Sequence, residues 1–229
     1  NAPEDQLEEI CKKYWNNSGV RRYYIDRYFE KKEYDRVLQV LDESIELDKA
    51  YRGQVLEYIQ KKKEIYRLQG NKSAYIEQLW KLVLEQSAGD LDIYKELKAQ
   101  YSEKEWLIKR EELFKKLPAN AHIDRLYKEE KLYDRLLAYV LKSSGLYAVQ
   151  SYENVLKKEY PKQILSKYQG EVNKMASCTG NRKHYADLVA LLRRMKRIKG
   201  GSEIVETIVE EWKIKYRNRP AMMDELSKL

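Results

Sequence analysis

Two stretches of this chain, roughly a hundred residues apart, carry nearly the same pattern. Residues 25–38 read IDRYFEKKEYDRVL, and residues 123–137 read IDRLYKEEKLYDRLL. A second pair of similar stretches is Gly70-Asn71 and Gly180-Asn181. Tyr75 and Tyr185 lie four positions after the respective asparagines. Internal similarity of this kind is typical of stacked helix pairs, because each unit buries its apolar face against its neighbour. The repetition therefore predicts an architecture, but it does not indicate a reaction.

Apolar residues recur with helical spacing along the whole chain. The clearest stripe joins Tyr185, Leu188 and Leu192. Nine Gly and four Pro are few for 229 residues, which disfavours an all-β fold, and no segment shows sustained two-residue alternation. The chain is therefore predicted to be all-α, a tetratricopeptide-like α-solenoid of irregular antiparallel helix pairs. It is not a true tetratricopeptide array, because the repeat interval varies.

Glycines, prolines and capping residues divide the chain into helices. Gly70-Asn71 and Gly200-Gly201-Ser202 each give a stop followed by a cap, and Ser102 with Glu105 forms a capping box. Gly180-Asn181 is interpreted as a second stop of the Gly70 type. Fourteen helices are predicted, at 4–15, 20–31, 33–46, 49–69, 71–87, 90–100, 102–116, 121–129, 131–142, 146–158, 161–178, 182–198, 202–216 and 220–228.

Nothing in the composition resembles a flexible linker, so residues 3–229 are predicted to form one continuous α-helical repeat domain. Asn1-Ala2 is typical of a cleaved expression tag, and the chain is expected to come from a longer protein. Cys11 and Cys178 give no disulfide framework, which favours a reducing compartment. No apolar run approaches the ~18 residues of a membrane span, and there is no signal peptide. These features predict a cytoplasmic protein.

The repeated Asp-Arg pairs have a structural interpretation. Asp26, Asp35, Asp124 and Asp134 are expected near helix starts, where a carboxylate complements the helix dipole. The chain has 20 Tyr against 4 Trp and 2 Phe, so tyrosine is expected to be the core aromatic residue of a thin array. A binding groove lined with rings is the alternative. The equivalent residues Tyr34 and Tyr133 are predicted to be largely buried.

Catalytic residue patterns are scarce. Cys178 and His184 lie six residues apart across a turn, but no Asp or Glu with recognisable spacing completes a metal site. There is no glycine loop for phosphate, no Gly-x-Ser-x-Gly and no His-Glu-x-x-His. We therefore expect no enzyme activity, no cofactor, no metal and no small-molecule substrate.

Positive charge is concentrated towards the C-terminus. The net charge is +8, and residues 1–60 hold 10 Lys+Arg against 13 Asp+Glu, while residues 61–229 hold 35 against 24. The candidate partner-binding or anion-binding residues are Arg193, Arg194, Arg197, Lys199, Lys213 and Arg217. The three arginines of 193–197 lie off the apolar stripe and are expected to face outward. The simplest interpretation is a solvated surface whose charges pair with Glu203, Glu206 and Glu210. Binding of an acidic protein surface is the second interpretation, and binding of nucleic acid is the third.

The C-terminal part also resembles a known family. The matching elements include Trp106 with Arg110-Glu111-Glu112-Leu113, then Tyr160-Pro161, and finally Arg-x-Arg-Pro-Ala at 217–221 with Asp224-Glu225-Leu226. Over residues 90–229 the chain resembles the helical C-terminal region of bacterial SWIM zinc-finger proteins. The resemblance implies a helical array that follows a zinc module built on Cys-x-Cys and Cys-x-His, which contacts DNA or proteins. Neither pair occurs here, so no zinc ligand is assigned.

Together these features predict a non-catalytic helical-repeat scaffold for protein–protein interaction, the C-terminal part of a larger SWIM-type zinc-finger protein. The protein partner is expected on a concave helical surface. The alternative is a nucleic-acid-binding module that uses the basic C-terminal helices. No interaction with a membrane is expected.

Overall fold

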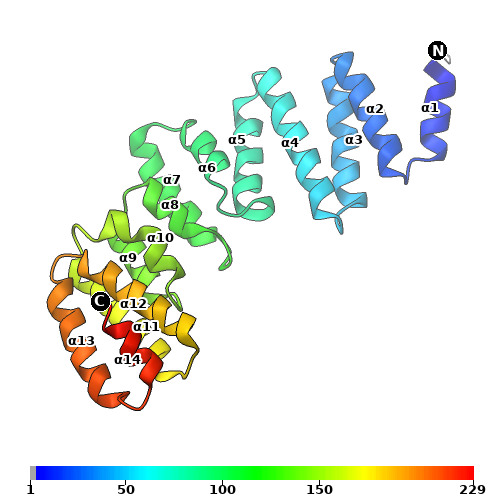
Figure 1. Cartoon of the computed structure of the whole chain (residues 1–229). Coiled ribbons are helices and arrows are strands. Elements are labelled where there is room, and N and C mark those ends of the chain that lie inside the picture. The colour runs from blue at the N-terminus through cyan, green and yellow to red at the C-terminus, as the bar shows by residue number, and fades with distance from the viewer. Residues whose placement is uncertain (1–3) are drawn as a thin grey trace. The chain divides into compact units, whose positions relative to one another are not determined.

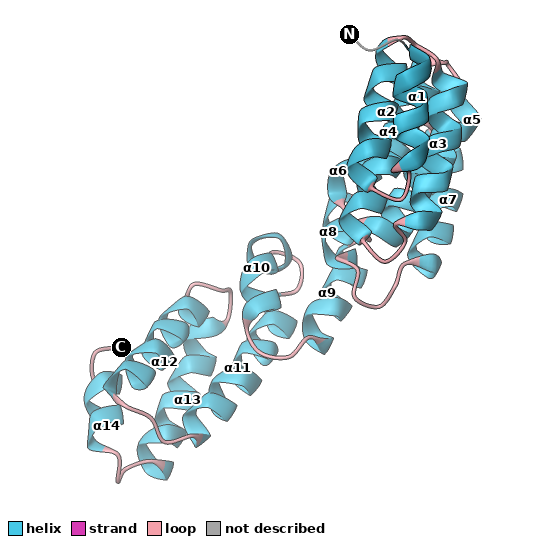
Figure 2. Cartoon of the chain, turned by 90° about the vertical axis from the view of Figure 1, so that its right-hand side faces the viewer, coloured by secondary structure: helices cyan, strands magenta, loops and turns pink. Residues whose placement is uncertain are grey.

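The computed structural model describes residues 4–229, and the described part of the chain contains helices and connecting loops but no strand (Figure 1). Figure 2 shows the same elements coloured by type. The predicted all-α fold is confirmed, and so is the number of α-helices, which is fourteen within the described range. Asn1-Ala2, interpreted above as a tag remnant, lies outside the described residues.

The chain divides into two compact units, with the border between Leu126 and Tyr127. The first unit holds α1 (Glu4–Lys13), α2 (Ser18–Glu30), α3 (Tyr34–Leu47), α4 (Arg52–Leu68), α5 (Lys72–Lys81), α6 (Leu91–Lys98) and α7 (Glu103–Lys116). A short helix, α8 (Ile123–Glu129), spans the border. The second unit holds α9 (Tyr133–Lys142), α10 (Tyr147–Leu156), α11 (Pro161–Ser177), α12 (Arg182–Lys196), α13 (Gly201–Lys215) and α14 (Pro220–Leu226). The single continuous domain over 3–229 stays a prediction.

Several helix ends form as the sequence predicts. The Ser102 side chain accepts from the Glu105 backbone N–H, and the Glu105 carboxylate accepts from the Ser102 N–H at 2.9 Å, which completes a capping box. Gly70 has a φ of +69°, the left-handed conformation of a helix stop, and Asn71 then caps α5. These ends depend on local chemistry only, which is why they can be predicted.

At two of the predicted helix ends, the glycine or the capping residue does not have the predicted role. Gly200, with a φ of +81°, takes the cap position of α13, so that Ser202 lies inside the helix and does not cap it. Gly201 begins α13 so close to α12 that a Cβ on it would lie 1.9 Å from the Met195 carbonyl oxygen. Gly180 is not left-handed, because α11 already ends at Ser177. The Asn at 181 does cap α12, as Asn71 caps α5.

Both similar segments contain the same type of turn, which the sequence pattern did not predict. Lys32 and Lys131 both have positive φ, +61° and +55°, which is uncommon for a residue with a Cβ. In each turn the N–H of the following residue donates to a tyrosine carbonyl five positions earlier, Tyr28 at 3.0 Å and Tyr127 at 2.9 Å. This is the Schellman type of helix end. The repeated pattern therefore marks the same turn between two helices.

The aspartates of the similar segments do not all behave alike. Asp35, Asp124 and Asp134 lie in the first turns of α3, α8 and α9, as expected. Asp26 lies in the last turns of α2, so its prediction as a helix-start residue is wrong. The reason is that α2 begins at Ser18, where Asn17 already provides the cap.

Each unit has its own apolar core. The core of the second unit is continuous, from Leu136 on α9 to Leu226 on α14, and includes Tyr185. The first unit has three smaller clusters, and Tyr75 belongs to one of them. Tyr34 and Tyr133 are only partly buried and pack against the edges of these cores.

Helix α5 widens into a π-helical segment, Leu82–Gln86, where an ordinary α-helix was predicted up to residue 87. Both Leu82 and Val83 are fully buried, although neighbouring residues of an α-helix point about 100° apart. Leu82 packs with Val55 and Ile59, while Val83 joins the separate cluster around Leu79. The wide turn therefore lets one segment contribute to two clusters.

A buried polar network joins α2, α3 and α4 in the first unit. Arg21 is fully buried, and it donates to Asp48 at 2.5 Å, to the Ser44 hydroxyl at 3.0 Å and to the Trp15 carbonyl at 2.6 Å. Tyr58 donates to the same Asp48 carboxylate at 2.7 Å. Burial raises the pKa of Asp48, but the hydrogen bonds from Arg21 and Tyr58 outweigh it and hold that pKa below its usual value.

Candidate functional site

The net positive charge of the chain belongs to the second unit. Residues 1–126 contain 24 Lys+Arg and 24 Asp+Glu, whereas residues 127–229 contain 21 Lys+Arg and 13 Asp+Glu. The second unit therefore accounts for the whole formal charge of +8. A surface that attracts anions is expected there and not in the first unit.

A hollow of about 420 Å³ opens in the second unit between α10 and α12. Three of its lining residues come from α10 or its C-terminal end and four from α12 or its C-terminal end. They are Glu153, Asn154, Lys157, Ala190, Arg193, Arg194 and Arg197. We call it the α10/α12 hollow. It brings together three of the six basic residues that the sequence singled out, together with a lysine that it did not.

The α10/α12 hollow contains one buried carboxylate. Glu153 is 4% exposed, and it accepts from Arg194 Nε at 2.5 Å, from the Tyr168 hydroxyl at 2.7 Å and from Lys157 Nζ at 3.4 Å. Burial raises the pKa of Glu153, but the hydrogen bonds from Tyr168 and Arg194 outweigh it and hold that pKa below its usual value. Glu153 is therefore ionised at neutral pH and fixes Arg194 in place.

Arg194 does not face outward, which corrects the prediction for this residue. Its side chain is 36% exposed and turns towards α10, where it also donates to the Gln150 carbonyl at 3.1 Å. Its acidic partner is Glu153, 41 positions earlier in the chain, and not an acid of α13 as expected. The pairing depends on how α10 and α12 flank α11, which helical spacing along α12 alone does not specify.

Arg193 and Arg197 are exposed, as predicted, and lie one turn apart on α12 and its C-terminal cap. Arg193 donates to the Lys228 carbonyl at 2.5 Å. The Arg197 side chain has no hydrogen bond or ion pair within the described part of the chain. Like charges one turn apart repel, although the C-terminal end of the helix dipole favours both. The hollow thus keeps cationic groups that no acid of the second unit neutralises.

The remaining predicted residues lie outside the α10/α12 hollow. Lys199 follows the end of α12, Lys213 lies on α13, and Arg217 follows α13. All three are exposed. They extend the basic surface but do not share the hollow, so the structure divides the predicted patch into two groups of three.

Sequence reasoning missed the contribution of α10. Glu153 and Lys157 form an i, i+4 pair, a spacing that is visible in the sequence. That pattern alone is typical of any exposed helix face. What marks Glu153 as special is its burial and its bond to Tyr168, which lies 15 positions away on α11.

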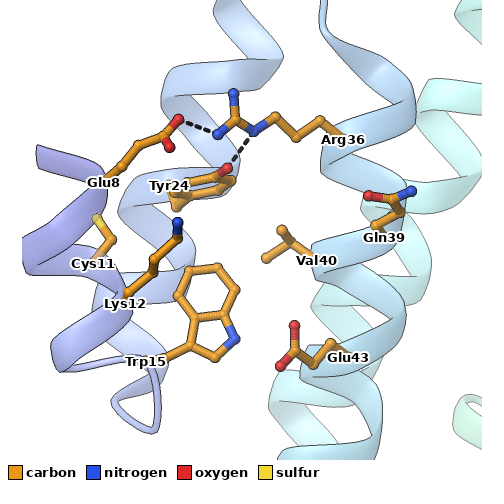
Figure 3. Close-up of a pocket in the computed structure, with 9 residues that line it drawn as sticks. All are labelled: Glu8, Cys11, Lys12, Trp15, Tyr24, Arg36, Gln39, Val40 and Glu43. Atoms are coloured by element: carbon orange, nitrogen blue, oxygen red, sulfur yellow. Dashed lines mark hydrogen bonds and ion pairs between the residues drawn. The ribbon is translucent and has the colours of Figure 1, made fainter. Parts of the chain in front are cut away.

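A second hollow, of about 400 Å³, lies in the first unit beside α1, α2 and α3. Figure 3 shows its lining, with Glu8 on α1 and Arg36 on α3 pointing towards each other. Arg36 is bonded to Glu8 and to the Tyr24 hydroxyl, and its guanidinium lies 3.9 Å from the centre of the Tyr28 ring. The arginine of this hollow is therefore already neutralised by an internal acid.

The two residues weighed as metal ligands are engaged elsewhere or exposed. His184 Nε2 lies 3.1 Å from the Met175 carbonyl, and Cys178 is exposed. Among the described residues, no group of three or more His, Cys, Asp or Glu could hold a metal ion. None of the described helices is both long and apolar enough to cross a membrane.

Two comparisons with known proteins, one with family models and one with curated proteins, give no match to this chain. No model of a known protein family matches it, and no curated protein is significantly similar to it. The resemblance of residues 90–229 to SWIM zinc-finger proteins therefore stays a prediction.

Proposed function

We propose that this chain is a non-catalytic helical-repeat scaffold that binds an acidic segment of a partner protein at the α10/α12 hollow. The observation that carries the proposal is the excess of cations there, four basic side chains against the single carboxylate of Glu153. Arginine suits this role because its planar guanidinium presents several donors to a carboxylate or phosphate.

The hollow is also preorganised. Arg194 is held by a buried carboxylate and a backbone carbonyl, so a ligand would not have to order this side chain on binding. Arg193 is held by a hydrogen bond to the Lys228 carbonyl. Restricting side chains before the ligand arrives lowers the entropic cost of binding.

Nucleic-acid binding is the second candidate, and one observation favours it. Lys199, Lys213 and Arg217 are exposed and continue the positive surface beyond the hollow. A strand of nucleic acid would use such an extended surface, with binding that weakens steeply as salt rises. The α10/α12 hollow itself contains no aromatic lining residue on which a base would stack.

Within this proposal the helices of both units belong to one tetratricopeptide-like array that presents a concave surface to its partner. The longer protein would be a cytoplasmic bacterial protein of the SWIM zinc-finger type. The short helix-to-helix turns and the repeated Schellman ends support a repeat architecture.

The test uses two variants that remove equal charge. A fluorescein-labelled peptide of twelve residues rich in glutamate serves as the acidic probe, with fluorescence anisotropy as the readout. Arg193→Gln/Arg197→Gln should weaken binding at least tenfold, about 1.4 kcal/mol. Lys199→Gln/Lys213→Gln, the matched control, should change it less than about threefold.

Two results would overturn the proposal. One is an equal loss in both variants, which would mean that net charge and not the hollow attracts the peptide. The other is tighter binding of a labelled single-stranded oligonucleotide than of the peptide, with an affinity that falls in the Lys199→Gln/Lys213→Gln variant. This result would favour the second candidate.

A further inference from the structure

We infer that the α10/α12 hollow is built for a phosphomonoester, carried by a phosphorylated serine or threonine of the partner protein. This inference rests on the proposed function and specifies the acidic group that the hollow prefers. It follows from the number of charges in the hollow, from their position on two helices and from the carboxylate that is already present.

The charge count favours a dianion over a carboxylate. Lys157, Arg193, Arg194 and Arg197 line the hollow with one carboxylate, that of Glu153, so the lining carries a net charge of +3. A ligand carboxylate would leave two of these charges uncompensated. A phosphomonoester carries about two negative charges at pH 7 and leaves only one.

The donors that remain also suit three oxygen atoms better than two. Glu153 and Gln150 already occupy Nε and one terminal nitrogen of Arg194. Donors that stay available include the whole Arg197 guanidinium, the rest of the Arg193 guanidinium and two protons of Lys157. They come from both sides of the hollow, α12 and α10. A phosphoryl group presents three strong acceptors to such a set, and a carboxylate presents two.

A phosphodiester of nucleic acid fits this hollow less well. Each phosphodiester carries one charge, and successive charges are spread along a strand. The α10/α12 hollow gathers its cations around one buried acid instead of spacing them along a groove. Nucleic acid is therefore an outcome of the test and not the expected ligand.

The pH dependence of binding separates the ligand classes, because a phosphomonoester changes its charge between pH 5 and 7.5, whereas the glutamate side chain of a peptide changes little. The charged groups that line it are Glu153 and Lys157 of α10 and the three arginines of α12, and the buried Tyr168 hydroxyl of α11 donates to Glu153. Hydrogen bonds hold the pKa of Glu153 below its usual value, and burial, followed by the hydrogen bond to Glu153, raises the pKa of Tyr168. Neither histidine of the chain lines the hollow. A phosphomonoester loses its second charge with a pKa near 6.

The experiment compares three fluorescein-labelled peptide libraries with the same degenerate flanks and a central phosphoserine, glutamate or serine. At pH 7.5 the phosphoserine library should bind at least tenfold more tightly than the glutamate library. At pH 5.0 it should lose about tenfold, since only about a tenth of the phosphoryl groups remain dianionic at a pKa near 6. The glutamate library should change little over the same range, because Glu titrates near pH 4.3.

Two variants locate the site. Arg197→Gln should weaken phosphoserine binding about tenfold, whereas Lys199→Gln, an equal loss of charge two positions away, should leave it unchanged. Ala190→Glu places an acid inside the hollow, one turn before Arg194 on an exposed position of α12. It should abolish phosphoserine binding while circular dichroism confirms intact helices.

Each outcome has a distinct meaning. Equal affinity for phosphoserine and glutamate overturns this inference but leaves the proposed function standing. If neither the phosphoserine library nor the glutamate library binds, both this inference and the proposed function are overturned. Tighter binding of a labelled single-stranded oligonucleotide, without loss at pH 5.0, assigns the hollow to nucleic acid and overturns the inference as well.

Discussion

Glu153→Gln tests whether the ion pair of the α10/α12 hollow stabilises the second unit. The substitution keeps the shape of the side chain but removes its charge. Arg194 and Lys157 then lose their acidic partner, which lies at 2.5 Å and 3.4 Å from them. The Tyr168 hydroxyl keeps an acceptor, because the glutamine amide oxygen replaces a carboxylate oxygen.

The expected loss in the free energy of unfolding is about 3 kcal/mol. Removing one partner of a fully buried ion pair costs roughly 3–5 kcal/mol, because the other charge is left without compensation. Glu153 is buried, but the Arg194 side chain is 36% exposed, so that water can partly solvate it after the substitution. The loss therefore falls at the lower end of that range. Exposed Glu159 provides the matched control, and Glu159→Gln should cost less than about 0.5 kcal/mol.

The assay has to report on the second unit alone, because two compact units need not unfold together. Hydrogen exchange by mass spectrometry, followed in peptides from α10, α11 and α12 at increasing urea, gives that local free energy. A double-mutant cycle with Arg194→Met then isolates the pair, and its coupling should be about 2 kcal/mol.

Acid gives an independent check of the same pair. The pKa of Glu153 is lower in the folded chain than in the unfolded one, so its stabilisation is complete above the unfolded pKa, about 4.3. It disappears as the pH falls through the folded pKa. The difference in the free energy of unfolding between the natural chain and the Glu153→Gln variant should stay constant from pH 8 to about 5 and shrink below about pH 4. A difference under 1 kcal/mol at pH 7, or one that grows in acid, would refute the reasoning.

Two further predictions concern the scaffold of the first unit and the shared turn. Lys32→Gly and Lys131→Gly should each raise the free energy of unfolding by about 1 kcal/mol in urea titrations, because a left-handed φ costs a residue with a Cβ roughly 1–2 kcal/mol. Lys32→Ala, which removes the side chain without freeing the backbone, should bring no gain. Arg21→Met should cost about 3–5 kcal/mol by thermal unfolding, since Asp48 loses its buried partner, whereas exposed Arg22→Met should cost less than about 1 kcal/mol.

The helices could be predicted from the sequence because their ends depend on neighbouring residues. Every predicted boundary lies within three residues of the observed one when the π-helical segment is counted as the end of α5. The failures have a common cause in tertiary packing. The π-helical turn at Leu82 serves two clusters, and Gly201 begins α13 because α12 approaches too closely for any side chain.

The candidate site could be predicted only in part. Helical spacing correctly placed Arg193 and Arg197 on an exposed face of α12. It placed Arg194 there too, because residues 193 and 194 differ by only about 100° around the helix axis. Which of them turns inward depends on the position of Glu153 across α11, a relation between residues 41 positions apart. Local patterns carry no information on that pairing.

The similar segments and the α10/α12 hollow depend on different kinds of contact. The Schellman turns at Lys32 and Lys131 occur in both units, so they encode how one helix follows another. The hollows of the two units have nearly equal volumes, but Arg36 in the first is paired with Glu8, whereas Arg197 in the second makes no ion pair within the described residues. Under the proposed function, an anion bound in the second hollow would relieve the repulsion between Arg193 and Arg197, so its binding would also raise the stability of the second unit.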